Sequence, residues 1–351
     1  MKKLEIKPML LIIIFLIVGI GIFLLENTLK PENYGSLLLT LLFWVAIVQG
    51  CIALVAAADL AKGKWIAPLK KHLLSVYPLI LLIAVLFLIM SRQMNIYHWT
   101  EEKSDFWFNE WSFIIRNFVL LVASFVLAWK FARESIKESE KKNLWAALYI
   151  LSFVVSQSLI GFDWVMSLEY PWISTLFGAY FFIEATYLGL ATAAIFYLFL
   201  LRNASLENPE QARKTLKDVA TFMFGFSLFW AGMFFAQFLT IWYGNLPEEV
   251  MFTTKRLASP LFTAMSRYVL GALFFVPFIV LLSRKIKSIP IGVSIIALVV
   301  MSGVFVERLF FLMPNVSING FIAGIEVVLM LVLFILTLGS RERLLNSTIQ
   351  F

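Results

Sequence analysis

The chain has very few of the residues that hold redox cofactors. Its 351 residues include one cysteine, Cys51, and two histidines, His72 and His98. A single cysteine excludes an internal disulfide framework and a cysteine-ligated cluster. Both histidines fall between apolar segments, which excludes a bis-histidine haem within a membrane. The sequence also lacks a phosphate-binding loop motif, residues spaced like metal ligands, and a nucleophile with a neighbouring general base. We therefore expect no metal and no cofactor in this chain.

Charged residues are scarce, whereas apolar residues are abundant. Only 15% of the residues are charged, 61% are hydrophobic and 35 are phenylalanine. Soluble domains average roughly 45–50% apolar residues, and a membrane-spanning helix needs about 20 of them in a row. Ten segments are apolar enough: roughly 8–25, 35–58, 73–91, 112–129, 144–162, 174–201, 216–241, 263–283, 289–306 and 320–338. The sequence predicts an all-α polytopic membrane protein with ten transmembrane helices, in which residues 1–351 form a single integral membrane domain.

Basic residues are unevenly distributed between the two sides that these spans define. The side with both termini carries 21 Lys and Arg residues, and the other side carries 6. The positive-inside rule therefore predicts that both termini are cytoplasmic. The net charge of +7 follows from this topology, so we expect membrane lipid around the chain and no nucleic-acid partner.

An internal repeat recurs at a spacing of four helices. Arg116 and Arg267 occupy matching places at the outer ends of helices 4 and 8, and the helix after each ends with an acid, Asp163 or Glu307. Four helices is an even number, so the halves are parallel repeats. We expect two four-helix bundles and two peripheral helices: helices 2–5 at 35–163, helices 6–9 at 174–310, and the peripheral helices with the termini at 1–30 and 320–351.

The matched arginines and acids predict two ion pairs, Arg116 with Asp163 and Arg267 with Glu307. Charges inside a membrane generally pair with one another. Two interpretations remain open at this point. The pairs either fix the packing of helices or form an outer-facing polar pocket through which protons leave.

Helix 5 and the loop after it carry further polar residues. Ser152, Ser156 and Asp163 are spaced by four and seven residues, which places them on one helical face, and Gln157 lies beside them. Such a stripe can hold water and pass protons, or it can join helices by hydrogen bonds. The following loop contains no Lys or Arg and adds Glu169, which we include among the candidates for a proton path.

Glu184 is the acid placed deepest in the membrane by the sequence. It stands ten residues after Ser174, about 15 Å along a helix, and it shares a helical face with Tyr180 and Tyr187. A charged side chain at the centre of a bilayer costs about 3 kcal/mol on insertion scales. We predict a proton path through Glu184, Tyr180 and Tyr187, and the alternative is a neutral glutamic acid that is hydrogen-bonded to a neighbouring tyrosine.

Four stretches resemble one known family. They read Asp-Trp-Val-Met-Ser-Leu-Glu at 163–169, Trp-Ile-Ser-Thr-Leu-Phe-Gly at 172–178, Gln-Phe-Leu-Thr-Ile-Trp-Tyr-Gly-Asn-Leu-Pro-Glu-Glu at 237–249 and Val-Pro-Phe-Ile-Val-Leu-Leu-Ser-Arg at 276–284. In these stretches the chain resembles the ActF membrane subunits of alternative complex III, a bacterial quinol:cytochrome c oxidoreductase. Those subunits belong to the NrfD-type polytopic anchors, which contain two four-helix bundles. One position departs from the family pattern, because Pro171 stands where a histidine is usual.

This resemblance implies a cofactor-free subunit that helps to anchor a quinol-oxidising complex of a respiratory chain and to translocate protons. It also implies a bacterial inner-membrane location and a homologous quinol-binding membrane subunit as neighbour. Iron–sulfur and c-type cytochrome subunits would cover the outer face, so quinol, haem c and iron–sulfur clusters would belong to partners. Two alternatives stay open: a free-standing proton-coupled transporter, and a quinol-binding NrfD-type anchor.

Overall fold

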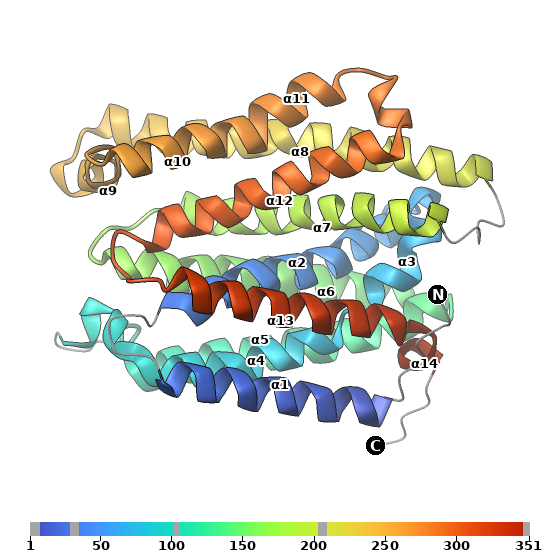
Figure 1. Cartoon of the computed structure of the whole chain (residues 1–351), viewed down its shortest axis with the longest axis horizontal. Coiled ribbons are helices and arrows are strands. Elements are labelled where there is room, and N and C mark those ends of the chain that lie inside the picture. Colours follow the sequence, from blue (N-terminus) through green and yellow to red (C-terminus); the bar gives the residue numbers. More distant parts are fainter. Residues whose placement is uncertain (1–7, 29–34, 102–105, 203–208, 347–351) are drawn as a thin grey trace.

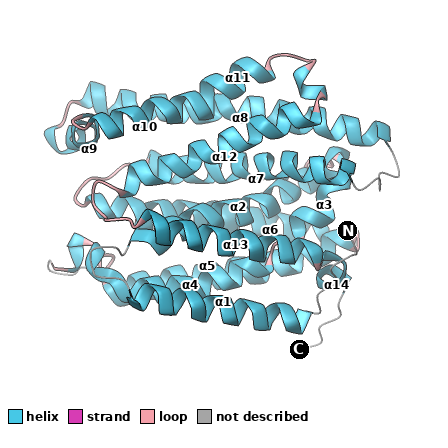
Figure 2. Cartoon of the chain, in the orientation of Figure 1, coloured by secondary structure: helices cyan, strands magenta, loops and turns pink. Residues whose placement is uncertain are grey.

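The molecule is a layered bundle of helices that run approximately along one direction (Figure 1). The computed structural model describes residues 8–28, 35–101, 106–202 and 209–346. Within these residues it consists of helices and their connections, without a sheet (Figure 2). Ten of the described helices are long and apolar enough to cross a membrane. The chain is therefore a multi-pass membrane protein, and the ten predicted spans are confirmed.

The spans coincide with the apolar runs of the sequence. In chain order they are α1 (Pro8–Thr28), α2 (Gly35–Leu60), α4 (Pro78–Met90), α5 (Glu110–Ile136), α6 (Lys142–Ile160), α7 (Leu176–Arg202), α8 (Pro209–Gly244), α10 (Pro260–Leu270) with α11 (Val276–Leu281), α12 (Pro290–Leu312) and α13 (Gly320–Gly339). A π-helical turn, Gly271–Phe275, joins α10 to α11. Three shorter helices complete the order: α3 (Ala67–Leu74), α9 (Pro247–Leu257) and α14 (Arg341–Asn346).

Several helices begin at residues that favour a helix start. Asn109 accepts hydrogen bonds from the backbone N–H groups of Trp111 and Ser112, at 3.0 and 3.3 Å, where α5 begins. Asn319 caps α13 in the same way, and asparagine is among the preferred residues at this position. Proline occupies the first turn of α4, α9, α10 and α12, where its missing N–H costs no helical hydrogen bond. These local signals favour a helix start at each of these positions.

The helix α2 runs through the middle of the molecule (Figure 1) and is buried along nearly its whole length. It packs against α4, α6, α7, α12 and α13. Its contact with α7 is closest at two glycines: a Cβ added to Gly50 would stand 1.8 Å from the carbonyl oxygen of Ala185, and one added to Gly189 would stand 2.5 Å from that of Gly50. Small residues permit such close approach of two backbones in a membrane, so α2 and α7 form the central seam of the fold.

The remaining spans pack around this seam. On one side α5 contacts α4 and α6, and on the other side α7 and α12 pack together with α8, α10 and α11, whereas α1 contacts α4 and α13. We call the end that carries α9 the outer end and the end that carries α3 and α14 the inner end, after the sidedness expected from the basic residues. The same rule predicts that both termini are cytoplasmic, but residues 1–7 and 347–351 lie outside the described residues.

Candidate functional site

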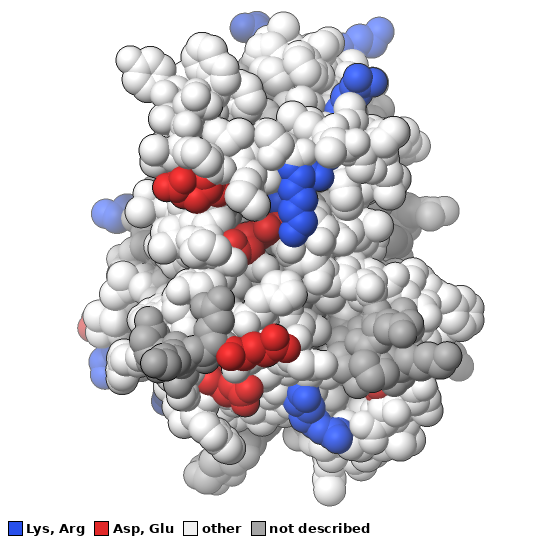
Figure 3. Space-filling model, turned by 90° about the vertical axis from the view of Figure 1, so that its left-hand side faces the viewer, with Lys and Arg blue, Asp and Glu red and all other residues white. Residues whose placement is uncertain are grey.

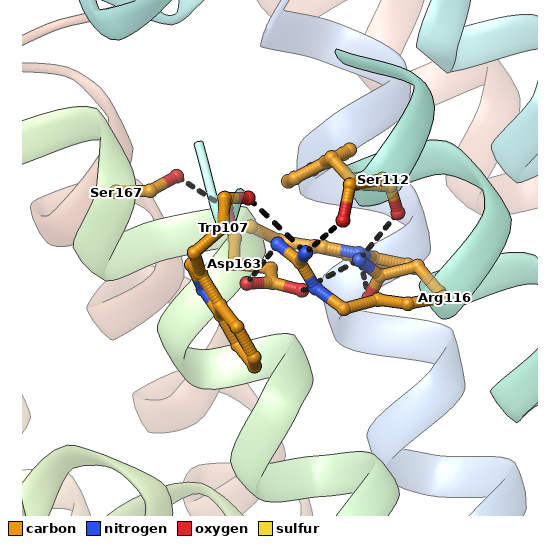
Figure 4. Close-up of polar contacts among 8 residues, drawn as sticks. Trp107, Ser112, Arg116, Asp163 and Ser167 are labelled. Carbon is orange, nitrogen blue, oxygen red and sulfur yellow. Dashed lines mark hydrogen bonds and ion pairs between the residues drawn. The ribbon is translucent and has the colours of Figure 1, made fainter. Parts of the chain in front are cut away.

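An ion pair joins α5 to the end of α6 at the outer end of the molecule (Figure 4). Arg116 Nε and Nη2 donate to the two carboxylate oxygens of Asp163 at 2.7 and 2.9 Å. Arg116 Nη1 donates to the carbonyl of Trp107 at 3.2 Å and to Ser112 Oγ at 3.1 Å. The indole ring of Trp107 covers the guanidinium, with its centre 4.1 Å from the guanidinium carbon. The structure therefore brings Arg116 and Asp163 together, in the bidentate geometry that makes such pairs strong.

The carboxylate of Asp163 is fully satisfied. It lies in a π-helical turn, Gly161–Val165, that continues α6, and only 2% of the residue is exposed. Its Oδ2 accepts a further hydrogen bond from Asn117 Nδ2 at 2.6 Å, and the amide oxygen of Asn117 accepts from Trp164 Nε1 at 3.0 Å. Ser167 donates its hydroxyl to the backbone carbonyl of Asp163 (Figure 4). With every acceptor occupied, this cluster is suited to holding helices together.

Glu169, a candidate for the proton path, lies against α9 instead of the helix interior. Arg256 Nη2 donates to Glu169 Oε1 at 2.6 Å, and Lys255 Nζ lies 3.6 Å from Oε2. Arg256 is 1% exposed and also donates to the backbone carbonyls of Phe252 and Phe311, both at 3.0 Å. Glu169 thus fastens the outer loop to α9, at an end of the molecule whose surface shows acidic and basic side chains in small groups among uncharged ones (Figure 3).

A second polar cluster lies deeper, between α7, α8 and α12. Glu184 is 0% exposed, its Oε2 lies 2.6 Å from Arg308 Nη2, and its Oε1 accepts a hydrogen bond from Trp230 Nε1 at 3.2 Å. The carboxyl group of Glu307 lies within hydrogen-bonding reach of that of Glu184, and the Tyr180 hydroxyl donates to Glu307 Oε1. Two acids and one base therefore share a site that is closed to solvent, roughly 12 Å from the start of α7 at the rise of an α-helix.

Arg308 is the least satisfied member of this cluster. Its side chain is 0% exposed and covers the ring of Phe181 at 3.9 Å from the ring centre. None of its three guanidinium nitrogens makes a hydrogen bond to the described residues. The 2.6 Å contact with Glu184 is thus an ion pair whose N–H groups are not aligned on the carboxylate. Because unsatisfied buried donors are costly, we expect internal water molecules beside Arg308.

Arg267 does not pair with Glu307, which corrects the second ion pair expected from the sequence. The Arg267 side chain is exposed, and none of the ion pairs among the described residues includes it. The reason is the length of α12, which continues to Leu312 and not only to about residue 306. Glu307 and Arg308 therefore lie within the helix and both are buried, so the neighbouring arginine supplies the cation.

Tyr187 hydrogen-bonds to the α10–α11 region and not to Glu184. Its hydroxyl donates to the backbone carbonyl of Leu273 at 3.3 Å. An α-helix would pair that carbonyl with the N–H four residues later, which Pro277 lacks. A carbonyl left without its helical partner needs another donor in a membrane, and Tyr187 provides one. Of the two tyrosines expected beside Glu184, the structure therefore brings only Tyr180 to the buried acids.

A cavity of about 340 Å³ adjoins the cluster between α7, α8, α9, α10 and α12. Its walls are mainly apolar, and its few polar groups include Glu307 and Tyr180 from the buried cluster and Gln237 and Arg256 nearer the outer end. Pockets for small ligands have volumes of roughly 300–1,000 Å³. Of the two buried acids, Glu307 lines the cavity. The cavity is large enough for a chain of water molecules or a small apolar ligand.

The middle of the α2–α6 half contains a neutral hydrogen-bond network around Gln49. Gln49 Nε2 donates to Ser124 Oγ at 3.2 Å and to Ser156 Oγ at 3.0 Å. Gln157 Nε2 donates to Gln49 Oε1 at 2.9 Å. Two of the residues expected on the polar stripe, Ser156 and Gln157, are thus brought together, whereas the hydroxyl of Ser152 has no hydrogen bond to the described residues.

A charged cluster closes the inner end of the same half. Lys70 Nζ lies 3.1 Å from Asp59 Oδ1 and 2.6 Å from Glu138 Oε1, and Lys142 Nζ lies 2.6 Å from Glu138 Oε2. Hydrogen bonds from Lys142 and Lys70 lower the pKa of Glu138, so it is ionised at neutral pH. Gln49 and Asp59 are ten residues apart on α2, roughly 15 Å along the helix, which leaves an apolar gap between the two clusters.

Sequence reasoning missed three central residues, Gln49, Trp230 and Arg308. Gln49 is the only amide in the 26 residues of α2, and that isolation was a usable signal. Arg308 lies beyond the ninth apolar segment, 289–306, so the sequence alone places it outside the membrane. Trp230 carries no sequence signal, since an indole in an apolar helix is typical of packing.

The arrangement is suited to proton chemistry. Among the described residues, no group of three or more His, Cys, Asp or Glu side chains is placed to hold a metal ion. Carboxyl and phenol groups can each bind and release a proton, and they meet in the Glu184–Glu307–Arg308 cluster. We take this cluster and its cavity as the candidate functional site. The chain matches no protein-family model and no curated protein sequence.

Proposed function

We propose that this chain is a cofactor-free membrane subunit of a bacterial quinol-oxidising electron-transfer complex, which it helps to anchor and in which it conducts protons. The four stretches similar to ActF subunits support membership of such a complex. The homologous quinol-binding subunit and the outer-face iron–sulfur and c-type cytochrome subunits would carry quinol, clusters and haem c.

The proposal includes the arrangement in the membrane. Both termini face the cytoplasm, because 21 of the Lys and Arg residues lie on that side. The helices α2, α4, α5 and α6 form one four-helix bundle, and α7, α8, α10–α11 and α12 form the second as its parallel repeat. The contacts of α1 with α4 and α13 support a position of α1 and α13 at the edge.

The buried acid pair is the observation that carries the proton role. Glu184 and Glu307 lie within hydrogen-bonding reach of each other, and Arg308 is the one cation beside them among the described residues. All three residues are at most 2% exposed. Two ionised carboxylates would leave a net negative charge in a site of low dielectric, whereas one bound proton makes the cluster neutral. A cluster that is balanced only with one proton is suited to receiving a proton and passing it on.

Access to the pair comes from the cavity. Glu307 and Tyr180 both line it, and Gln237 and Arg256 line it nearer the outer end. The Tyr180 hydroxyl, which donates to Glu307, can exchange its proton with water in the cavity. We therefore propose that protons move between the outer end and Glu184 through this cavity and Glu307.

The test uses Glu184→Gln and Glu307→Gln in the assembled complex. Glutamine keeps the size and hydrogen-bonding capacity of the side chain but cannot titrate, so the complex should assemble with all its redox centres. Proton release per electron should fall at least about tenfold, since acid–base steps typically contribute a hundredfold or more and parallel water paths soften the loss. Glu248→Gln, at an exposed acid of α9, is the matched control. Wild-type proton release in both glutamine variants would contradict the proposal.

The same preparation separates this proposal from a free-standing proton-coupled transporter. A subunit of an electron-transfer complex should co-purify with haem and iron–sulfur proteins in constant proportion. A transporter should purify alone in an active form and bind a solute. Purification of the chain without any redox protein, from cells that express it at native levels, would contradict membership of a complex.

The cavity favours a second candidate function, a quinol-binding anchor. Its apolar walls fit a lipid-soluble ring, and the carboxylate of Glu307 could receive the proton of a hydroxyl group through Tyr180, which passes on its own proton as it takes up the new one. In that case Leu270→Trp, which places an indole at a lining position, should remove quinone that co-purifies with the chain. Leu261→Trp, at an exposed position of the same helix, should retain it. Equal quinone content in both variants would exclude this candidate.

A further inference from the structure

Two glutamates from opposite ends of the chain meet at the edge of the fold. Glu26 lies near the end of α1, and Glu326 lies in the second turn of α13. They are only 3% and 0% exposed, although most of the surface of α1 is open to the surroundings of the protein. The two carboxyl groups lie within hydrogen-bonding reach of each other, so that they can share a hydrogen bond when one of them is protonated. This pair is separate from the Glu184 cluster, which is built on other helices.

Each of these carboxyl groups has one oxygen satisfied and one oxygen without a partner. Gln93 Nε2 donates to Glu26 Oε2 at 2.8 Å, and Thr40 Oγ1 donates to Glu326 Oε2 at 3.1 Å. Glu26 Oε1 and Glu326 Oε1 are buried and have no hydrogen bond to the described residues. The amide oxygen of Gln93, a residue that is 8% exposed, is likewise unpartnered beside Glu26. Three buried acceptors in one place therefore lack a donor from the part of the chain that the structure describes.

Among the described residues, no cation forms an ion pair at this site, with either Glu26 or Glu326. The charged residue next to the cluster on the chain is Arg92, and its Nη1 donates to Asn27 Oδ1 at 3.3 Å while its guanidinium covers the ring of Phe23. The neighbouring helices α2 and α4 contain no Lys, Arg or His, and α2 contributes the hydroxyl of Thr40. Two carboxylates in contact without a cation repel each other, whereas one proton converts the repulsion into a hydrogen bond.

We propose that Glu26 and Glu326 form a second proton-binding site, in which one proton is held between the two carboxyl groups. The shared proton satisfies the two unpartnered carboxyl oxygens and joins α1 to α13, while Gln93 and Thr40 hold the outer sides of the pair. When the proton is lost at alkaline pH, the two like charges repel and α1 is no longer held against α13. The site thus makes the docking of α1 dependent on pH, whether or not the Glu184 cluster conducts protons.

Infrared difference spectra of the purified full-length protein test the shared proton. A protonated carboxyl group has a carbonyl band that a carboxylate lacks, and exposed glutamates are fully ionised at about pH 8. We expect one band at that pH that disappears both in Glu26→Gln and in Glu326→Gln. It should persist in Glu110→Gln, which alters an exposed acid of the outer end. A spectrum that is unchanged in both glutamine variants would overturn the proposal.

The thermal stability of the same proteins provides an independent readout. Glu326→Gln offers a permanent amide donor to Glu26, so its unfolding temperature should change less between about pH 7 and pH 10 than that of the wild type, which loses the proton of a buried carboxyl group in this range. A wild-type unfolding temperature that rises with Na⁺ but not with choline, and only while both glutamates are present, would assign the site to a bound cation and overturn the shared proton.

Discussion

Arg116 and Arg308 are both arginines beside a buried acid, yet their surroundings differ completely. Arg116 uses all three guanidinium nitrogens, on Asp163, Trp107 and Ser112. Arg308 has one ion pair, with Glu184, and lies over the ring of Phe181, but it has no aligned hydrogen bond to the described residues. The first arginine has one acid whose oxygens are all occupied, and the second faces two acids that need a proton to be balanced.

This difference separates structural polar groups from reactive ones. A fully satisfied buried pair has no reason to exchange protons or bind water, because any change would remove a strong contact. An incompletely satisfied cluster gains free energy from water, protons or ligands, since these complete its hydrogen bonds. The comparison therefore supports the proposal that the Arg116–Asp163 pair serves helix packing and the Arg308 cluster serves proton transfer.

The largest expected effect is on the satisfied pair. Arg116→Ala leaves the buried Asp163 carboxylate without a cation, so the free energy of unfolding should fall by about 3–5 kcal/mol. Arg116→Ala combined with Asp163→Asn should recover part of this loss. The measurement is a double-mutant cycle of unfolding in detergent. Additive losses, without coupling between the two positions, would show that the pair does not hold the helices.

Removal of the incompletely satisfied arginine should cost less. Arg308→Gln should lower the free energy of unfolding by about 2 kcal/mol at neutral pH, below the range for breaking a buried pair, because Glu184 and Glu307 can bind a second proton once the cation is gone. The loss should shrink further at about pH 5, where protonation is easier. A loss equal to that of Arg116→Ala and independent of pH would remove the distinction between the two sites.

His72 at the inner end is a third incompletely satisfied group, because its buried Nδ1 has no hydrogen bond to the described residues. It predicts how the stability of the protein depends on pH. Burial, followed by the charges of Arg341 and Lys71, lowers the pKa of His72 from 6.5 to about 4. Between these two pH values, His72 is protonated in the unfolded chain but neutral in the folded chain. The free energy of unfolding therefore falls as the pH drops from 6.5 to 4. We expect a loss of about 1–2 kcal/mol for this partly buried residue, less than the full shift implies at 1.36 kcal/mol per pKa unit. His72→Gln should abolish this component of the pH profile, and an unchanged profile in that variant would assign the loss to other groups.

The smallest expected effect tests a single satisfied carbonyl. Tyr187→Phe removes the hydroxyl that donates to the carbonyl of Leu273 and should cost about 1 kcal/mol of stability. In a Pro277→Ala background the new N–H of residue 277 can bond to that carbonyl, so the same substitution should cost clearly less. Equal costs in both backgrounds would show that proline does not create the need for the tyrosine.

The sequence predicted the spans well because the signal is local. A run of about 20 apolar residues is long enough to cross the hydrocarbon core of a membrane as a helix. Each of the ten predicted runs corresponds to a long apolar helix in the described structure. Arg116 and Asp163 were also predictable as partners, since they lie on consecutive helices near the same end. The partner of Glu307 was not, because a charged pair at the end of an apolar run looks like the start of a loop, although α12 continues to Leu312.

What the sequence by itself determined is therefore the all-helical membrane fold, the number of spans and the presence of acids within them. Tertiary structure alone decided which acids meet. Whether Glu184 reaches Glu307 and Arg308, or Glu26 reaches Glu326, depends on the rotation and vertical position of helices that are far apart in the chain. Those quantities are set by close contacts such as Gly50 on Ala185. The physical reason is that hydrophobicity specifies where a helix crosses the membrane, whereas side-chain packing specifies which of its faces meets which neighbour.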